Sequence, residues 1–534
     1  MILFARSHQK TNEGQAMNLE MRPTGRRRRH TYIALCIAMG AIFLQVPARG
    51  AVSPPQSAEK LVLGHLTTKD RVDVLDLKGQ HISADFLAEL IAHPPNDAHA
   101  LTLRNATVDG QLSVSNATIK IALTFDSCTF EDGIDLSSDI FMQSFSLTGS
   151  VVGELNSGAP ANFIGDRFVG SVDISRTHFR NGVDFTGAKI GGSFSANGAQ
   201  FESTEDPADF SNAAIRQQAT FEDMCFGGDV DFSAAELSSL TMSGGSSCGS
   251  NSGKPPQINL LLTHATVSDT LTVQNLKLAG IGTQSAEVMG NVSLQNVTPV
   301  RLADFTSSRL GNLAIDGFGS WLAVDDSSRP PMLRLDDARF DGLAVCRDVH
   351  QAPKGCAGQT AAANAAALLL QLLEKNNASY FTPQQYLELE RILQATGDAA
   401  GADDVYFRMR QEIRSHQLRD APARWLIDWL QYVLVGYGRR ILWTVVWALA
   451  FIVFGMFLFN GHLEPSSENT EESQPGWDTQ FWYSVDLLTP MDLGVVKNWK
   501  LKPADPRRHY APLHRLAGWV LIPLIAAAIT GIIK

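Results

Sequence analysis

The chain has 534 residues, of which 44% are hydrophobic and 19% charged, a composition typical of a packed protein long enough for several domains. Its formal net charge of -11 argues against a nucleic-acid-binding surface, because such surfaces are basic. The sequence contains no P-loop, no HExxH pair and no GxGxxG motif, so it offers none of the usual nucleotide, zinc or dinucleotide sites. We therefore expect no cofactor and no nucleic-acid partner.

A basic segment followed by an apolar run lies near the start of the chain. Arg26–Arg29 precede fifteen uncharged residues, Tyr32–Val46, and small residues follow. This order predicts a secretory signal peptide at residues 1–50, cleaved after Gly50. A short N-terminal membrane anchor is the alternative, because fifteen apolar residues barely span a bilayer. The true start codon stays open.

Residues 51–100 are predicted to form a linker and an N-terminal cap. Residues 51–60 contain Pro and Ser and are expected to be a flexible lead-in, and residues 72–77 fit a short strand. Ser83 is a suitable N-cap for a helix over residues 84–92. The apolar stripe of this helix consists of Phe86, Leu87, Leu90 and Ile91. Such a helix would cover the unpaired end of a β structure.

From residue 101 to residue 345, apolar residues recur at alternating intervals of five and six. The clearest run is Leu103, Val108, Val114, Ile119, Phe125, Phe130, Leu136, Phe141, Leu147 and Val152. Alternation within each unit, as in Leu101-x-Leu103, indicates short strands, and the small residues between units indicate tight turns. Two intervals make half a coil, and about 22 residues make a full coil. The inward residues of each coil stack on the equivalent residues of the next coil. The pattern predicts a mainly β protein with a β-helix solenoid over residues 101–345.

Three segments carry a more specific motif. Residues 183–190 read Val-Asp-Phe-Thr-Gly-Ala-Lys-Ile, residues 208–215 Ala-Asp-Phe-Ser-Asn-Ala-Ala-Ile, and residues 230–237 Val-Asp-Phe-Ser-Ala-Ala-Glu-Leu. They resemble pentapeptide repeats, although an extra residue at every second side breaks the strict period of five. The resemblance implies a right-handed, quadrilateral β-helix. The chain is similar to a divergent bacterial group that joins such a solenoid to a C-terminal membrane segment. Some of that group is labelled membrane-associated oxidoreductase, an activity that no residue pattern here supports.

Acidic residues recur at one position of the repeat, and β-helix enzymes that cleave polysaccharides use carboxylates gathered on one face. The recurring residues are Asp173, Asp184, Asp209 and Asp231. Because a catalytic pair should stand out from the repeat, this regularity argues against chemistry. We expect no catalytic residue and no metal site, since the histidines are scattered.

Two cysteines close a short polar loop where the solenoid ends. Cys346 and Cys356 are predicted to form a disulfide, as is usual in exported proteins, and a two-cysteine metal site is the alternative. Cys128 and Cys225 lie at repeat positions beside inward residues and are expected to be packing residues.

Residues 346–440 are predicted to form a helical adaptor. Helices are expected over residues 361–374, from Pro383 to residue 395, and over residues 402–417, because Gly397 interrupts the pattern. An aromatic, amphipathic helix is expected over residues 425–435, suited to lying at a bilayer surface.

Residues 441–534 are predicted to form a membrane domain. Residues 441–461 and 516–533 are expected to be transmembrane helices. Between them, residues 477–490 form an aromatic, amphipathic segment that is either interfacial or re-entrant. If this segment lines a pore or an interface, the residues expected there are Trp477, Trp482, Asp486 and Asp492.

These features predict a membrane-anchored, non-catalytic scaffold in the bacterial inner membrane, with its β-helix in the periplasm. Its partners would be the lipid bilayer and an unidentified protein, and a homo-oligomer is possible. Membrane orientation stays open. The predicted signal peptide places the β-helix outside the cytoplasm, but arginines precede the first predicted transmembrane helix, and the positive-inside rule alone would give the reverse orientation. An oligomeric channel or transport accessory is the alternative function. An envelope enzyme acting on polysaccharide or in redox chemistry is the second alternative.

Overall fold

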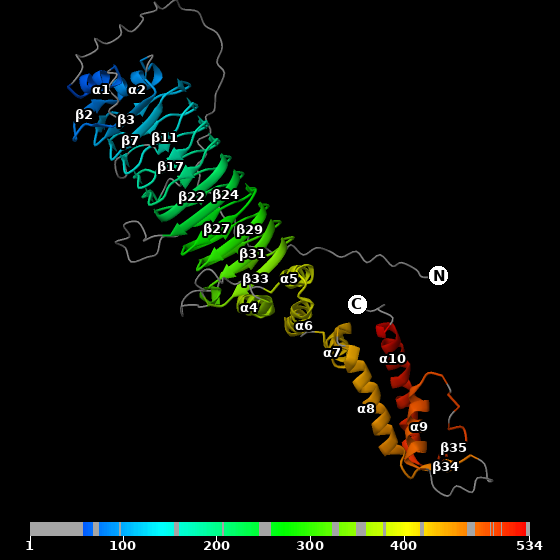
Figure 1. The fold of residues 1–534 in the computed structure, drawn as a ribbon. Coiled ribbons are helices and arrows are strands. Elements are labelled where there is room, and N and C mark those ends of the chain that lie inside the picture. The colour runs from blue at the N-terminus through cyan, green and yellow to red at the C-terminus, as the bar shows by residue number, and fades with distance from the viewer. Residues whose placement is uncertain are drawn as a thin grey trace, which may run out of the picture. The chain divides into compact units, whose positions relative to one another are not determined.

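The fold is built around a long parallel β-solenoid with helices at both ends (Figure 1). The computed structural model describes residues 57–529, except for residues 68–73, 96–97, 154–157, 159, 205–207, 245–257, 323–330, 349–358, 378–380, 417–420, 440, 467–475, 492, 495 and 504. The predicted signal peptide lies outside these described residues.

The coils are about 22 residues long, as predicted. Leu101 pairs in register with Leu123, and Leu123 with Phe145, always in parallel. A ten-stranded sheet takes one strand from each coil: β5 (Leu112–Ser113), β9 (Ile134–Asp135), β13 (Ala161–Asn162), β17 (Val183–Asp184), β21 (Ala208–Asp209), β23 (Val230–Asp231), β25 (Asn259–Leu261), β28 (Lys277–Gly282), β30 (Thr298–Asp304) and β32 (Met332–Arg334).

The remaining solenoid strands form a 23-stranded sheet that wraps the other sides. It comprises β1 (Leu75–Asp76), β2 (His81–Ser83), β3 (Ala100–Arg104), β4 (Thr107–Asp109), β6 (Thr118–Ile119), β7 (Ala122–Asp126), β8 (Thr129–Phe130), β10 (Ile140–Phe141), β11 (Phe145–Ser146), β12 (Val151–Val152), β14 (Arg167–Phe168), β15 (Val172–Asp173), β16 (His178–Phe179), β18 (Lys189–Ile190), β19 (Phe194–Ser195), β20 (Gln200–Phe201), β22 (Ala214–Phe226), β24 (Glu236–Gly244), β26 (Thr266–Val267), β27 (Leu271–Gln274), β29 (Glu287–Gln295), β31 (Arg309–Asp316) and β33 (Arg339–Cys346).

Left-handed turn residues explain the half-coil interval. Asn105, Asn116, Ser127, Ser138 and Gly149 all have positive φ and follow one another every eleven residues. Glycine and short polar residues adopt this conformation at low cost, which is why they occupy most of these positions, although Arg176 and His264 also have positive φ.

Phenylalanine stacks fill the middle of the solenoid. Phe163 and Phe185 stack at 4.6 Å between ring centroids, Phe185 and Phe210 at 5.3 Å, and Phe210 and Phe232 at 5.1 Å. Each ring therefore packs on its equivalents one coil away, and no single coil could bury this surface alone.

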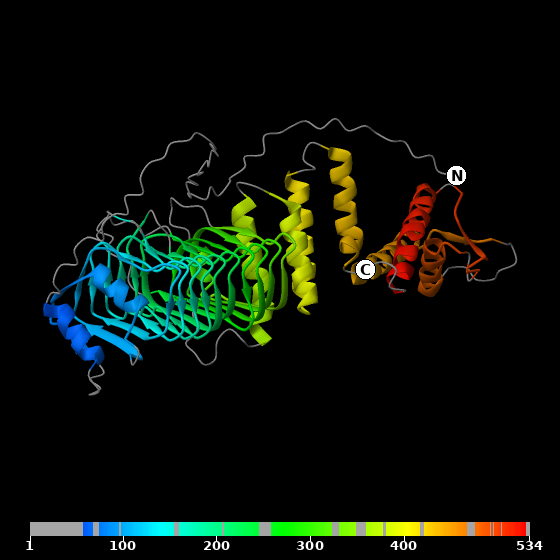
Figure 2. The same cartoon turned by 90° about the horizontal axis from the view of Figure 1, so that it is seen from above.

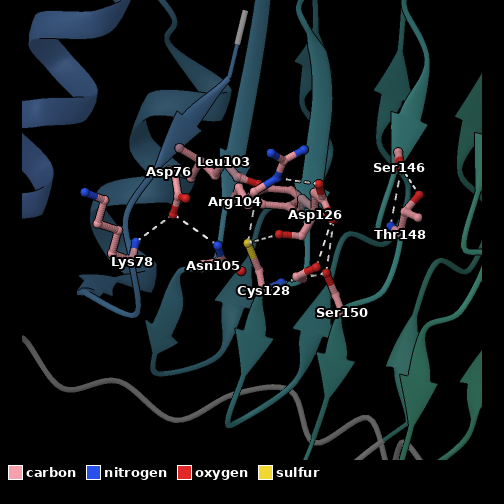
Figure 3. A network of polar contacts seen from close by, with 12 residues as sticks. Asp76, Lys78, Leu103, Arg104, Asn105, Asp126, Cys128, Ser146, Thr148 and Ser150 are labelled. Carbon is pink, nitrogen blue, oxygen red and sulfur yellow. Dashed lines mark hydrogen bonds and ion pairs between the residues drawn. The ribbon is translucent and has the colours of Figure 1, made fainter.

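Polar side chains at the solenoid corners satisfy the main chain (Figure 3). Ser150 Oγ donates to Phe125 O at 3.0 Å and accepts from Cys128 N at 3.0 Å. The Cys128 thiol is free and buried, and burial raises its pKa to about 11, so it is a packing residue as expected. Cys225 differs from the prediction, because it is disulfide-bonded.

Helices cover the first coil (Figure 2). The predicted capping helix is confirmed as α2 (Ala84–Ala92), with Leu87, Leu90 and Ile91 buried. A second helix, α1 (Ser57–Thr67), begins within the segment predicted as a flexible lead-in and buries Val62. Pro54 and Pro55 are typical of a loop, whereas the helix begins shortly after them.

Helices also continue from the last coil, and the predicted adaptor helices are present. The elements are α3 (Gly319–Leu322), α4 (Gln359–Asn377), α5 (Pro383–Ala395), α6 (Ala399–His416), α7 (Pro422–Val435), η1 (Gly436–Gly438), α8 (Ile441–Phe459), β34 (Leu463–Pro465), α9 (Trp477–Leu488), β35 (Trp499–Leu501), η2 (Pro506–His509) and α10 (Ala511–Ile529). Helix α4 packs on β33 and α6, and α9 packs against both α8 and α10.

The prediction of two transmembrane helices is wrong. Among the described residues, no helix combines the length and the apolar character that crossing a membrane requires. A span needs about 20 consecutive apolar residues. Helix α8 instead ends at Phe459, where Gly461 turns with a φ of +71°, and α10 begins at Ala511 and includes His514 and Arg515. The first predicted span, residues 441–461, is therefore longer than α8, and the second, residues 516–533, begins inside α10 rather than at its start.

Candidate functional site

Helices α7, α8 and α10 carry many large apolar side chains on their outer surfaces. We call this set the apolar helix surface: Trp425, Leu426, Ile427, Trp429, Leu430, Val446, Leu449, Val453, Phe454, Phe457, Leu513, Leu516, Trp519 and Val520. Val446, Phe457 and Trp519 are 62%, 69% and 62% exposed. Apolar side chains gathered in such number mark an interaction site, because monomeric soluble proteins rarely expose large apolar patches.

The interior between α8, α9 and α10 holds polar side chains beside a small apolar cluster of Ala448, Leu488 and Leu521. Thr444, Gln480, Ser484 and His514 are buried, while many of the large apolar side chains of α7, α8 and α10 are exposed. Water-facing helices have the opposite distribution, with an apolar stripe toward the core. Polar contacts between helices and apolar outer faces are typical of helices that pack in contact with lipid.

A histidine lies at the centre of this polar interior. His514 Nε2 lies 3.1 Å from Ser484 O and 3.2 Å from Ser484 Oγ, and Tyr510 Oη lies 3.3 Å from its Nδ1. Ser484 Oγ donates to Ile452 O at 2.9 Å, so one cluster links α8, α9 and α10. Burial lowers the pKa of His514 and favours the neutral imidazole. Both side chains are buried, so a substrate could not reach them, and the cluster holds the helices together.

A glycine sets the distance between α9 and α10. A Cβ on Gly518 would lie 1.6 Å from Leu488 O, so the two helices touch through main chain. We expect Gly518→Val to destabilise the helical region by about 1–3 kcal/mol, because α10 must move away from α9. Limited proteolysis of residues 441–529 would show faster cleavage. The matched control is Leu516→Val, an exposed position on the same helix; equal cleavage of the two variants would contradict the prediction.

The residues predicted for a pore or interface lie in different settings. Trp477 and Trp482 are exposed on α9, at 75% and 45%. Asp486 accepts a hydrogen bond from Leu493 N at 2.9 Å and so holds the loop that follows α9. Asp492 lies outside the described residues. Their grouping at a pore or interface stays a prediction.

Cys346 is disulfide-bonded. Its predicted partner, Cys356, lies outside the part of the chain that the structure describes, so the pairing itself stays a prediction.

Arginines before α8 are used in ion pairs, which sequence reasoning missed. Asp428 is buried and forms ion pairs with Arg410 at 2.6 Å and with Arg414 at 3.3 Å. The Tyr437 hydroxyl donates a hydrogen bond to the same carboxylate at 2.7 Å. Arg439 pairs with Asp403 at 3.0 Å. Because these cations are neutralised within the adaptor, they carry less weight in the positive-inside argument than their number in the sequence suggested.

The recurring aspartates of the solenoid have a structural role. Asp173, Asp184, Asp209 and Asp231 each accept a hydrogen bond from the backbone N–H two residues further on, at 2.7–2.9 Å. Each carboxylate therefore closes a turn, as Asp side chains commonly do.

Comparisons with family models, curated proteins and solved structures give no match for this chain. The resemblance to pentapeptide-repeat proteins therefore rests on the repeat motifs alone.

Proposed function

We propose that this protein is a non-catalytic scaffold that is held at a lipid surface by α7, α8 and α10 and presents its solenoid to a protein partner. The observation that carries the proposal is the distribution of side chains in the C-terminal helices, where the polar Ser484 and His514 are buried and the large apolar Val446, Phe457 and Trp519 are exposed. In water this arrangement is costly, whereas contact with lipid removes the apolar side chains from water.

Charge and aromatic content favour lipid over other occupants of the apolar helix surface. Tryptophans are enriched where proteins meet the lipid headgroups, and Trp425, Trp429 and Trp519 belong to this surface. The exposed Arg424 and Arg515 adjoin it and would attract anionic headgroups. An apolar hollow of about 510 Å³ also lies between α7 and α10.

The cysteines support an exported location. Cys225 and Cys346 are disulfide-bonded, and disulfides persist in oxidising compartments. Together with the predicted signal peptide, this favours the periplasmic side of the bacterial inner membrane. The motifs of residues 183–190, 208–215 and 230–237 separately favour a pentapeptide-repeat type of solenoid. The channel hypothesis depended on two spanning helices and is not retained. No observation favours the enzyme hypothesis.

Vesicle sedimentation of the full chain tests the proposal. We expect the protein to pellet with phosphatidylcholine vesicles, and more strongly when phosphatidylglycerol is included. Trp425→Ser, Trp429→Ser and Phe457→Ser together should weaken binding by at least about tenfold, because burying each such side chain contributes about 1.5–3 kcal/mol.

The matched control replaces exposed apolar residues of the solenoid, Met142→Ser, Met289→Ser and Val300→Ser, and should bind vesicles like the unaltered chain. Far-UV circular dichroism confirms that both triple variants fold. The proposal is wrong if the chain stays in the supernatant. It is also wrong if the apolar helix surface only mediates self-association, which analytical ultracentrifugation without lipid would reveal.

A further inference from the structure

A trough runs along one flank of the solenoid, across five consecutive coils. Its volume is about 940 Å³, and it lies over β14, β18, β22, β24 and β26. Two columns of outward side chains form its walls. Arg167 and Lys189, paired in register, begin one column, and Arg216 and Ser238 belong to the other. Gly191 has no side chain and leaves the second wall open beside Lys189.

The floor of the trough is main chain. Phe168, Ile190 and Leu237 lie between the two walls, but their side chains are buried in the solenoid core. The backbone of this floor is already paired, for example from Gly191 N to Phe168 O at 2.8 Å. A peptide laid along the trough would therefore find no free strand edge on which to add a strand.

Three cations line one end of the trough on three successive coils. Arg167, Lys189 and Arg216 are exposed, and among the described residues none of them forms an ion pair or a side-chain hydrogen bond. The chain as a whole carries a formal net charge of -11, so this cluster is a positively charged site on a negatively charged protein. Clustered cations in a concave site attract anionic ligands.

We propose that the trough binds a carboxylated polysaccharide that lies along the solenoid axis. Successive coils are about 4.8 Å apart, so cations recur along the trough at a spacing comparable to one sugar unit. Arg167 and Lys189 stand on one wall and Arg216 on the other, so the three cations can meet carboxylates on either side of an extended glycan. The arginine guanidinium binds carboxylates through two parallel hydrogen bonds.

The other end of the trough suits sugar hydroxyls. Ser238, Thr266 and Ser268 line it and supply hydroxyl groups that both donate and accept. Phe168 is the one aromatic residue among the described residues of the lining, and it is buried. Nucleic-acid bases would therefore have no ring to stack on.

Calorimetric titration of the full chain with an oligogalacturonate tests this proposal, in the absence of lipid. We expect binding that weakens as salt is added, because the contacts are ionic and exposed. Arg167→Ala, Lys189→Ala and Arg216→Ala together should lower the affinity by at least about tenfold, since hydrogen bonds to charged groups contribute about 1.5–3 kcal/mol each.

Two further variants separate this site from general charge and from misfolding. Lys120→Ala, Arg180→Ala and Lys277→Ala together remove the same charge from exposed solenoid positions outside the trough and should leave the affinity unchanged. Glu236→Gln removes the carboxylate within the trough and should tighten binding a few-fold, a gain that misfolding could not produce.

Three results would overturn the proposal: no binding, equal binding of a neutral cello-oligosaccharide, or an equal loss in the control triple variant. Preferential binding of polyglutamate or single-stranded DNA would also overturn it. Because no vesicle is present, these outcomes leave the lipid proposal untouched. Conversely, the trough variants should pellet with vesicles like the unaltered chain.

Discussion

Replacing Phe210 by alanine is expected to lower the free energy of unfolding of the solenoid by about 3–5 kcal/mol. The Phe210 ring is fully buried, and its centroid lies no more than 5.3 Å from the ring centroids of Phe185, Phe194, Phe221 and Phe232. Truncation leaves a cavity that a rigid stack of coils cannot close. Because each coil is stabilised only by its neighbours, the defect weakens the array in its middle.

Urea unfolding followed by far-UV circular dichroism measures this loss. The transition of Phe210→Ala should move to lower urea concentration, and a separate early transition would show that the array has broken into two parts. Met289→Ala, at a solenoid position that is 62% exposed, should change the stability by no more than about 0.5 kcal/mol. An unchanged midpoint in Phe210→Ala would show that the stacked rings do not govern the stability of the solenoid.

The solenoid is also expected to lose stability as the pH rises from about 4 to about 8, because of two buried carboxyl groups. Asp139 and Asp166 are 1% and 0% exposed on adjacent coils. Asp166 Oδ1 accepts from Asp139 N at 2.8 Å, and Asp139 Oδ1 accepts from Ala117 N at 2.7 Å. Among the described residues, the second carboxyl oxygen of each has no hydrogen-bond partner.

Burial raises the pKa of Asp166 to about 8 and that of Asp139 to about 6, and the negative charge of Asp135 acts in the same direction. An aspartate in the unfolded chain has a pKa of about 3.9. The folded state therefore binds more protons than the unfolded state between these values. The contribution of these two groups to the stability of the folded state is therefore greatest below about pH 4, and this contribution is lost as the pH rises through the folded pKa values.

The expected loss between about pH 4 and about pH 8 is on the order of several kcal/mol, since one pKa unit corresponds to about 1.4 kcal/mol. Asp166→Asn keeps an oxygen that can accept from Asp139 N and should be more stable than the unaltered chain at about pH 8. It should also show a smaller pH dependence in urea unfolding. Asp132→Asn, which removes an exposed carboxylate, is the control. Equal pH dependence in all three proteins would contradict the assignment.

These two buried carboxyl groups show where the repeat pattern stops being informative. In later coils the equivalent corner position is alanine, at Ala188 and Ala213, which are buried. Neither Asp139 nor Asp166 stands out in the sequence, because acidic residues are frequent throughout the repeats. Their burial depends on the corner at which each one falls, and that depends on the register between coils.

The sequence by itself determined the features that depend on local pattern. The alternating intervals predicted a 22-residue coil, and the pairing of Leu101 with Leu123 confirms it. Pro383 predicted the start of α5, and Ser83 the start of α2, at the observed residues. Such features are readable because inward and outward positions, turns and helix starts each depend on residues close together in the chain.

The tertiary structure alone decided which distant residues meet. It paired Arg410 and Arg414 with Asp428, and it brought Ser484 and His514 together inside a helical region that exposes many large apolar side chains. It also ended α8 at Phe459, where the apolar sequence had predicted a membrane span. The trough formed by Arg167, Lys189 and Arg216 likewise exists only because coils more than twenty residues apart in sequence stack in register. Charge pairing and side-chain burial depend on such long-range contacts, which local sequence patterns do not encode.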